Sequence, residues 1–410
     1  MSPIHFQFME TALKKAGYNA VLLPTVDKNA VDEGLKYINN DACYPTIVTL
    51  GQIISYLKSG NVDLERTAVF MSQTGGGCRA SNYVALLRKA LKDLDMEQIP
   101  VISVNIAGLE SNPGFKFSAG LLKRMLMALV YGDVFMRVLY ATRPYEQVPG
   151  AADELYEKWS RVARRNVYTG SFRKFKSCIQ EIVKDFDALP LRDIKKPKVG
   201  VVGEILVKYH PNANNDIVGT IEREGGEAVV LDLIDFFLYG MYSKKFNFER
   251  LSGSYKAMVF NKAAIKAIEY FRKPARKALS ASIRFEEPMH IEDIAKKASE
   301  IISLGNQCGE GWLLTGEMVD LIDSGVENIV CMQPFACLPN HVTGKGVMKA
   351  MRKRNPLANI AAIDYDPGAS DVNQLNRIKL MMATAYKNME RNLSEQDRKK
   401  MEPVVFDKAE

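Results

Sequence analysis

The sequence predicts an α/β protein with two Rossmann- or flavodoxin-like parallel-sheet domains and helical elaborations. Three observations indicate this fold class. Short apolar runs alternate with amphipathic segments of helical period, the basic segment Lys195–Lys198 interrupts this alternation, and the same order of segments then returns. Strands that alternate with helices are typical of a parallel sheet with crossover helices. The 410 residues also exceed the usual size of one hydrophobic core.

Residues 1–190 carry the pattern of a first α/β domain with a helical extension. Gly17 ends the first helical segment, as glycine commonly does. Between about residues 119 and 189 strand patterns stop, and a helical apolar stripe that includes Phe175 and Ile179 takes over. The expected helices are Phe6–Ala16, Thr46–Lys58 and Ser81–Leu94, and the expected strands are Ala20–Leu23, Ala68–Ser72 and Val101–Asn105.

Residues 191–393 carry the pattern of a second α/β domain, and residues 394–410 form a charged tail. Pro197 within the basic segment marks the boundary between the domains. Helical patterns dominate from about Ala257 to Leu304. The expected strands are Val199–Val202, Ala228–Leu231, Asn328–Met332 and Ile360–Asp364, and the expected helices include Asp216–Glu224 and Val372–Arg391.

Composition excludes several classes of protein. The most apolar stretch, Leu121–Tyr140, is interrupted by four charged residues, so we expect no membrane span. The N-terminus lacks the pattern of a secretion signal, which predicts a cytoplasmic protein whose six cysteines form no structural disulfides. The net charge of +7 is spread over several segments without a nucleic-acid-binding motif. An anionic small molecule or an acidic partner therefore fits better than a nucleic acid.

Three cysteines lie at predicted strand-to-helix junctions, beside proline or glycine. Cys43 precedes Pro45, Cys78 follows three glycines, and Cys337 lies between two prolines. Such a turn frees backbone N–H groups and lets a side chain reach into a crevice, whereas a packed thiol lies more often inside a helix or strand. We expect these thiols to carry the chemistry, and their spacing alone leaves a nucleophile, a metal ligand and a packed thiol open.

The glycines Gly75, Gly76 and Gly77 form a loop between a predicted strand and the N-terminus of a helix. With Arg79 as the nearest cation, this loop is a candidate site for an anion or a cofactor. Its N–H groups are expected to lower the pKa of Cys78. No Gly-Lys-[Ser/Thr] follows, so it is not a Walker A loop. The alternative is a tight turn whose glycines allow close helix packing.

The other cysteines give weaker signals. Cys178 falls on a helical apolar stripe and Cys331 falls inside a strand, so we expect both to be packed in the core. Cys308 lies in a glycine-rich segment and is a possible further metal ligand. Cys337 and His341 lack the second pair of ligands that a structural zinc site needs.

Three carboxylates are candidates for catalysis. Glu204 follows a predicted strand, and Glu310 and Glu317 flank the segment Gly-Trp-Leu-Leu-Thr-Gly. Each has an alternative role as a helix N-cap or a salt-bridge partner.

Taken together, the motifs resemble the superfamily of 2-hydroxyacyl-CoA dehydratases and activase-related proteins. The nearest branch is the carboxy-terminal region of large activase-like proteins. The resemblance covers nearly the whole chain, and it depends on the order of the motifs more than on any one of them. The matching segments are Asp41–Pro45, Gln73–Tyr83, Gly309–Met318 and Gln333–Pro339.

The resemblance implies a [4Fe-4S] cluster held by Cys43, Cys78 and Cys337 in a cleft. Three protein ligands would leave one iron open to a substrate, water or sulfide. In the dehydratases a separate ATP-dependent activase supplies one low-potential electron, which the cluster passes to a thioester carbonyl. No ATP-binding domain is recognisable in this chain, so the resemblance implies an activase on a separate chain or on a missing N-terminal segment. Related proteins that use six cysteines for a double-cubane iron–sulfur cluster are an alternative.

The expected function is that of an iron–sulfur lyase or reductase component of anaerobic metabolism, acting on a small molecule or an acyl-CoA, with a homo- or heterodimer possible. One alternative is a non-catalytic regulatory or assembly partner of an activase-type ATPase. Another is a metal-free nucleotide- or sugar-binding α/β protein.

Overall fold

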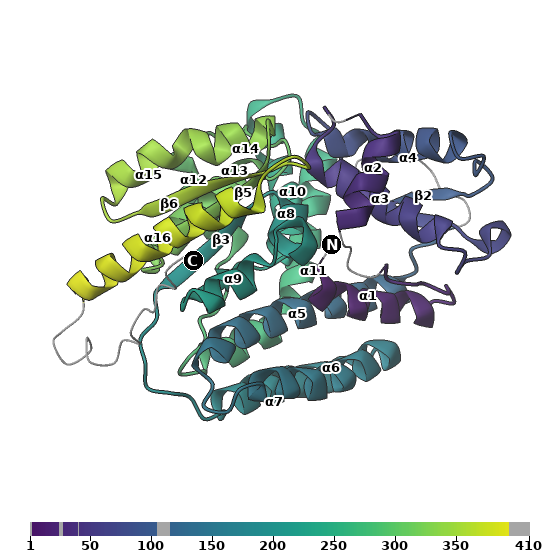
Figure 1. The fold of residues 1–410 in the computed structure, drawn as a ribbon. Coiled ribbons are helices and arrows are strands. Elements are labelled where there is room, and N and C mark those ends of the chain that lie inside the picture. Colours follow the sequence, from purple (N-terminus) through teal and green to yellow (C-terminus); the bar gives the residue numbers. More distant parts are fainter. Residues whose placement is uncertain (1, 24–27, 40, 105–114, 393–410) are drawn as a thin grey trace.

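A computed structural model of the chain describes residues 2–23, 28–39, 41–104 and 115–392, and it contains two parallel sheets joined and covered by helices (Figure 1). This confirms a mixed α/β fold. Asn105, the end of one predicted strand, and the predicted tail 394–410 lie outside the described residues.

The smaller sheet belongs to a unit near the N-terminus, drawn in purple and blue in Figure 1. Its two strands pair in parallel and are connected by a helix, as in a βαβ unit. Ile47, Leu50 and Leu87 belong to a core of its own. The elements of this unit are α2 (Lys28–Tyr37), α3 (Tyr44–Lys58), β1 (Val69–Ser72), η2 (Arg79–Asn82), α4 (Tyr83–Lys92) and β2 (Val101–Val104).

Residues Ala20–Leu23 do not form the predicted strand. Val21 is 56% exposed, and no described segment pairs with this stretch. A short apolar run becomes a strand only where a partner strand meets it. With two strands in its described part, the first sheet is smaller than a Rossmann- or flavodoxin-like domain, and the prediction of two such domains is not confirmed.

The larger sheet has four parallel strands in the order β4-β3-β5-β6. Helices cover both faces, so successive residues of one strand reach different cores: Val330 and Met332 face one, and Ile329 and Cys331 face the other. The chain goes outward from β3 to β4 on one side and continues through β5 and β6 on the other. The strands are β3 (Lys198–Gly203), β4 (Glu227–Val230), β5 (Asn328–Pro334) and β6 (Asn359–Tyr365).

Helices flank the strands of the larger sheet, and three successive helices separate β4 from the helix that precedes β5. The flanking helices are α8 (Ile205–Tyr209), α9 (Ile217–Arg223), α13 (Gly311–Asp323), α14 (Leu338–Thr343), α15 (Met348–Arg354) and α16 (Asp371–Asn392). The three successive helices are α10 (Ile234–Arg250), α11 (Tyr255–Ser280) and α12 (Ile291–Ser299).

The predicted helical extension is confirmed as α5 (Ala119–Thr142), α6 (Ala151–Thr169) and α7 (Phe172–Asp187), which lie beside α1 (Pro3–Lys15) in Figure 1. Their core is continuous with the core under β3 and β4. The domain boundary near residue 190 therefore remains a prediction. Among the described helices, the stretch Ala119–Tyr145 is long and apolar enough to cross a membrane, but 72% of its most apolar window is buried inside the protein, as in a core helix.

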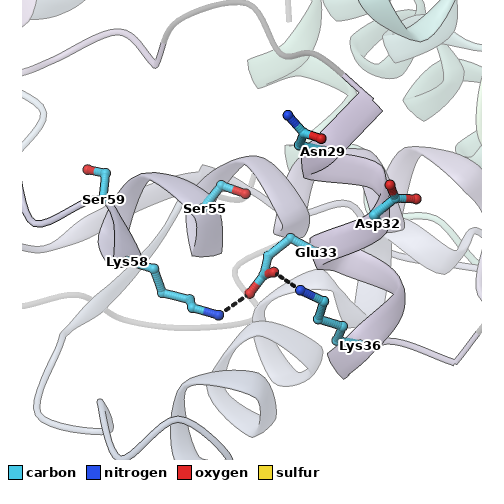
Figure 2. A pocket seen from close by; sticks show the side chains of 7 residues that line it. All are labelled: Asn29, Asp32, Glu33, Lys36, Ser55, Lys58 and Ser59. Carbon is cyan, nitrogen blue, oxygen red and sulfur yellow. Dashed lines mark hydrogen bonds and ion pairs between the residues drawn. The ribbon is translucent and has the colours of Figure 1, made fainter.

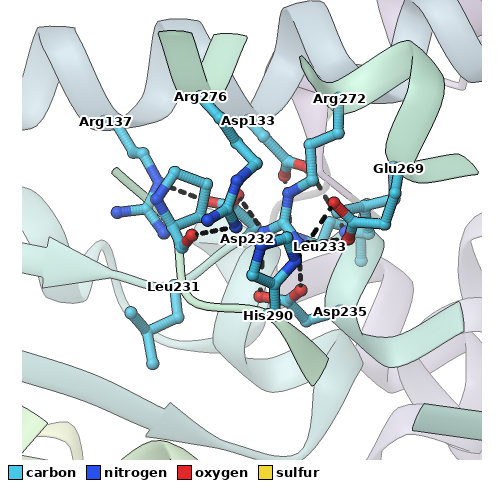
Figure 3. A network of polar contacts seen from close by, with 12 residues as sticks. Asp133, Arg137, Leu231, Asp232, Leu233, Asp235, Glu269, Arg272, Arg276 and His290 are labelled. Carbon is cyan, nitrogen blue, oxygen red and sulfur yellow. Dashed lines mark hydrogen bonds and ion pairs between the residues drawn. The ribbon is translucent and has the colours of Figure 1, made fainter. Parts of the chain in front are cut away.

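A buried group of charges, which we call the Arg272 network, ties this helical layer to the larger sheet (Figure 3). Arg272 of α11 donates hydrogen bonds to Asp232, which follows β4, at 2.6 Å and to Asp235 of α10 at 2.8 Å. Arg137 of α5 also donates to Asp232. Asp133 of α5 accepts from the backbone N–H of Leu233 at 2.7 Å. Four elements thus meet at one set of paired charges.

Candidate thiol site

The site begins at the carboxyl ends of β3 and β5. Between these two strands the strand order of the larger sheet reverses, which makes this a topological switch point. Glu204 follows β3 directly, and its backbone N–H donates to the Met332 carbonyl of β5 at 2.9 Å. Gly203 allows this approach: its φ is +138°, and a Cβ there would lie 1.8 Å from the Met332 oxygen. In open parallel sheets, ligands bind in the crevice at such a switch point.

Cys337 lies just beyond β5, at the N-cap of α14, as its two flanking prolines predict. Its half-buried Sγ lies near the backbone N–H of Asn340 but makes no capping hydrogen bond with it. The Asn340 side chain is fully buried, and neither of its amide atoms has a partner. Cys337 therefore extends from the carboxyl edge of the sheet on a rigid turn.

Cys43 and Cys78 come from the smaller unit, and both are N-caps. Cys43 caps α3, with its Sγ 3.0 Å from Thr46 Oγ1 and 3.5 Å from the Tyr83 hydroxyl. The described element before it is the helix α2, whereas the sequence predicted a strand at Ala20–Leu23, which does not form. Cys78 lies at the N-cap of η2 after β1, with its Sγ near the Ala80 N–H but without a capping hydrogen bond.

Several interactions place the start of α3 against the carboxyl edge of the larger sheet. Burial raises the pKa of Tyr44 to about 12, and the carboxylates of Asp371 and Asp366, beyond β6, add to the shift. Farther along α3, Gln52 Nε2 lies 3.2 Å from His210 Nε2, at the end of α8. The smaller unit thus covers the edge from which Glu204 and Cys337 extend.

Electrostatic interactions link the three predicted thiols in pairs. Cys43, if ionised, would act on Cys78, and Cys78, if ionised, would act on Cys337; Glu204 and Glu310 act on both Cys78 and Cys337. Three elements distant in sequence therefore converge on the space beside the switch point.

The predicted lowering of the Cys78 pKa is wrong for the metal-free protein. Burial raises this pKa to about 12 despite the opposing effect of the nearby Ala80 N–H, and the carboxylates of Glu310 and Glu204 raise it further. Burial likewise raises the pKa of Cys337. Loss of hydration outweighs one N–H donor, so both groups are neutral thiols until a cation joins them.

Two of the three predicted carboxylates belong to this neighbourhood. Glu204 caps α8 by accepting from the Val207 N–H at 2.9 Å, and Glu310 accepts from the Ile205 N–H at 3.0 Å. Loss of hydration, together with repulsion by Glu310, raises the pKa of Glu204 to about 8. Loss of hydration raises the pKa of Glu310 to about 7. Near neutral pH this pair can hold and release a proton. Glu317 instead forms a buried ion pair with Lys208 at 2.8 Å.

The glycine loop packs against Cys308. The Cys308 Sγ lies 3.3 Å from the position that a Cβ of Gly77 would take and 3.8 Å from that of Gly76. Gly75, Gly76 and Gly77 are exposed, as are Arg79 and Cys308. The loop therefore places a fourth, accessible thiol next to Cys78, while a cofactor role for the glycines and Arg79 remains a prediction.

Tyr239 of α10 reaches the same place, and no local pattern in the sequence indicated it. Its side chain is 4% exposed, and the charges that act on its hydroxyl are those of Glu310, Cys308 and Cys78. The hydroxyl has no hydrogen-bond partner. A buried donor without a partner requires an explanation, such as a ligand or ion that belongs there.

The two remaining cysteines are packed, as predicted. Cys178 lies in the core of the helical layer, and Cys331 is fully buried within β5. Within residues 2–23, 28–39, 41–104 and 115–392, no three His, Cys, Asp or Glu side chains are arranged to hold a single metal ion.

A depression elsewhere on the surface lies between α2 and α3, toward the C-terminal end of α3 (Figure 2). There Glu33 pairs with Lys58 and, at 2.6 Å, with Lys36. The hydrogen bond from Lys36, followed by that from Lys58, lowers the pKa of Glu33. A helix of 15 residues separates this end from Cys43 by roughly 20 Å. The depression is therefore distinct from the thiol site, and its central charges satisfy one another.

We use the name thiol site for Cys43, Cys78, Cys337, Glu204, Glu310, Tyr239 and the adjoining Cys308. In comparisons with known proteins, no family model, no curated protein and no solved structure matches this chain. The function is therefore argued from the chemistry of the thiol site.

Proposed function

We propose that Cys43, Cys78 and Cys337 hold a [4Fe-4S] cluster, in a protein that accepts low-potential electrons from a separate ATP-dependent activase and reduces or dehydrates a small molecule or an acyl-CoA. The observation that supports this most is the convergence of three thiols, each on a helix N-cap, from three distant segments. Thiolates are the usual ligands of iron–sulfur clusters.

The other residues of the thiol site have roles that suit this proposal. When bound, such a cluster supplies one-electron chemistry with an open iron position. The Ala80 and Asn340 N–H groups lie near the sulfurs of Cys78 and Cys337 and favour their thiolate forms. Glu204 and Glu310, with raised pKa values, can exchange a proton beside the ligands. Burial of Cys178 and Cys331 in cores favours this cluster over a six-cysteine double cubane.

The first test is a metal assay. Protein purified anaerobically and reconstituted with iron and sulfide should bind both and show thiolate-to-iron absorption. Cys43→Ala, Cys78→Ala and Cys337→Ala should each lose most of the iron, whereas Cys178→Ala and Cys331→Ala, which change buried cysteines outside the site, should retain it. Wild-type protein that stays colourless and iron-free would refute the proposal.

The same preparations separate the alternatives. A regulatory or assembly partner of an ATPase would bind the cluster without turnover. A metal-free binding protein would lack iron and show thermal shifts with ATP or with sugars.

A further inference from the structure

Tyr239 is held in place by contacts that do not involve its hydroxyl. Its ring packs edge-on against Trp312, with centroids 5.0 Å apart. Ser243 donates a hydrogen bond to the Tyr239 carbonyl at 2.9 Å and lies 3.2 Å from Trp312 Nε1, which donates to it. The direction of the hydroxyl is therefore set by the packing of α10 against α13.

The hydroxyl lies over the first residue of α13. A Cβ on Gly311 would be 2.2 Å from it, and Gly311 has a φ of +48° that suits glycine. Glu310, Cys308 and Cys78 are all close enough to act on the hydroxyl electrostatically. The hydroxyl thus lies at the thiol site, next to the residue that follows Glu310.

Other buried tyrosines of this protein use their hydroxyls within the fold. Tyr209 donates to the Leu231 carbonyl at 2.6 Å, and Tyr131 donates to Asn166 Oδ1 at 2.7 Å. Tyr239 is as buried as these but has no acceptor. An unused donor in such a place is the arrangement expected of a group that binds a ligand atom.

We propose that Tyr239 is a positioning residue whose hydroxyl donates a hydrogen bond to an electron-rich acceptor atom bound between Cys78 and Glu310. The acceptor is either a sulfur of the iron–sulfur group or an anionic oxygen of a small molecule bound beside it. This deepens the proposed function, but it requires only that the thiol site binds a ligand.

The test compares wild type, Tyr239→Phe and the matched control Tyr209→Phe, each metal-free and reconstituted with iron and sulfide. In metal-free protein, Tyr239→Phe should leave the melting temperature unchanged or raise it, because no bond is lost. Tyr209→Phe should lower it, because the Leu231 carbonyl loses its donor. An equal decrease in both variants would show that Tyr239 already has a partner and would overturn the proposal.

The reconstituted forms identify the acceptor. With sulfur as the acceptor, Tyr239→Phe should keep its iron but have a more negative midpoint potential, since hydrogen bonds to cluster sulfurs raise the potential. With oxygen as the acceptor, the midpoint potential should be unchanged, and the affinity for acetate, used as a minimal carboxylate probe, should fall about tenfold. If Tyr239→Phe changes neither the midpoint potential nor the acetate affinity, the proposal is also overturned. Failure of wild type to bind iron would refute the cluster alone, because the acetate measurement still tests Tyr239 in metal-free protein.

Discussion

The Arg272 network and the thiol site are both buried and polar, but they differ in how far their polar groups are paired. In the network, Arg272 is 1% exposed and donates to two carboxylates, and only its Nε has no partner. Burial favours the protonated form of Asp232, but Arg137 and Arg272 together lower its pKa. In the thiol site, the Tyr239 hydroxyl and the Asn340 amide have no partners.

This difference in pairing indicates that the Arg272 network stabilises the fold and that the thiol site binds a ligand. Paired buried charges hold α5, α10 and α11 at the end of β4, where removal of one partner leaves the others without compensation. In the thiol site Glu204 and Glu310 accept backbone N–H groups at the start of α8, but the neutral thiols and the unused Tyr239 donor lose hydration that no partner fully replaces. They are tolerated where a bound group completes their bonding, which is why the second region is our candidate site.

Removal of Arg272 should have the largest effect on stability. Arg272→Met leaves Asp232 and Asp235 buried without their main partner, and it should lower the free energy of unfolding by about 3–5 kcal/mol. Urea denaturation of metal-free protein measures this. The exposed neighbour Lys273 provides the control, since Lys273→Met should change stability by less than about 0.5 kcal/mol. Equal effects of the two substitutions would show that the Arg272 network does not stabilise the fold.

Gly203 tests whether the thiol site depends on the close contact of β3 with β5. In Gly203→Ala, the new Cβ would collide with the Met332 carbonyl at a positive φ, and stability should fall by about 2–4 kcal/mol. Gly240→Ala is the control: nothing lies within 4 Å of its Cβ position in helix α10, so stability should rise by about 0.5–1 kcal/mol. The measurement is again urea denaturation. A neutral Gly203→Ala would mean that the two strands separate readily at this edge.

Local sequence predicted those parts of the thiol site that local chemistry determines. Proline after Cys43, the prolines around Cys337 and the glycines before Cys78 all restrict the backbone, and each thiol is an N-cap in the structure. The strands of the larger sheet were also predictable, since a strand covered on both faces is a continuous apolar run.

Long-range pairing was not predictable in the same way. Arg272 lies 40 residues from Asp232, and Arg137 lies 95 residues from it. Nothing near Tyr239 in the sequence indicates that α10 brings it to Glu310. The strand expected at Ala20–Leu23 fails for the same reason, because its formation depends on a distant partner. The charge on Cys78 also depended on burial, which a short motif does not reveal.

Glu204 allows the smallest of these tests, which concerns pH. Its folded pKa of about 8 lies above the ordinary glutamate value of 4.5, so between these values the folded state binds more protons than the unfolded state. The free energy of unfolding of metal-free wild type should therefore decrease as the pH rises from about 5 to 8. Glu204→Gln keeps an oxygen for the Val207 N–H but has no proton to lose, so its decrease should be smaller by about 1–2 kcal/mol, a value reduced for the partial exposure of Glu204. Urea denaturation at pH 5.5, 7 and 8.5 measures how the free energy of unfolding changes with pH, and Glu97→Gln, at an exposed position, should follow wild type.

If the free energy of unfolding of Glu204→Gln changes with pH as that of wild type does, the Glu204 carboxyl titrates like one on the protein surface. The thiol site would then not differ from the surface in its electrostatics.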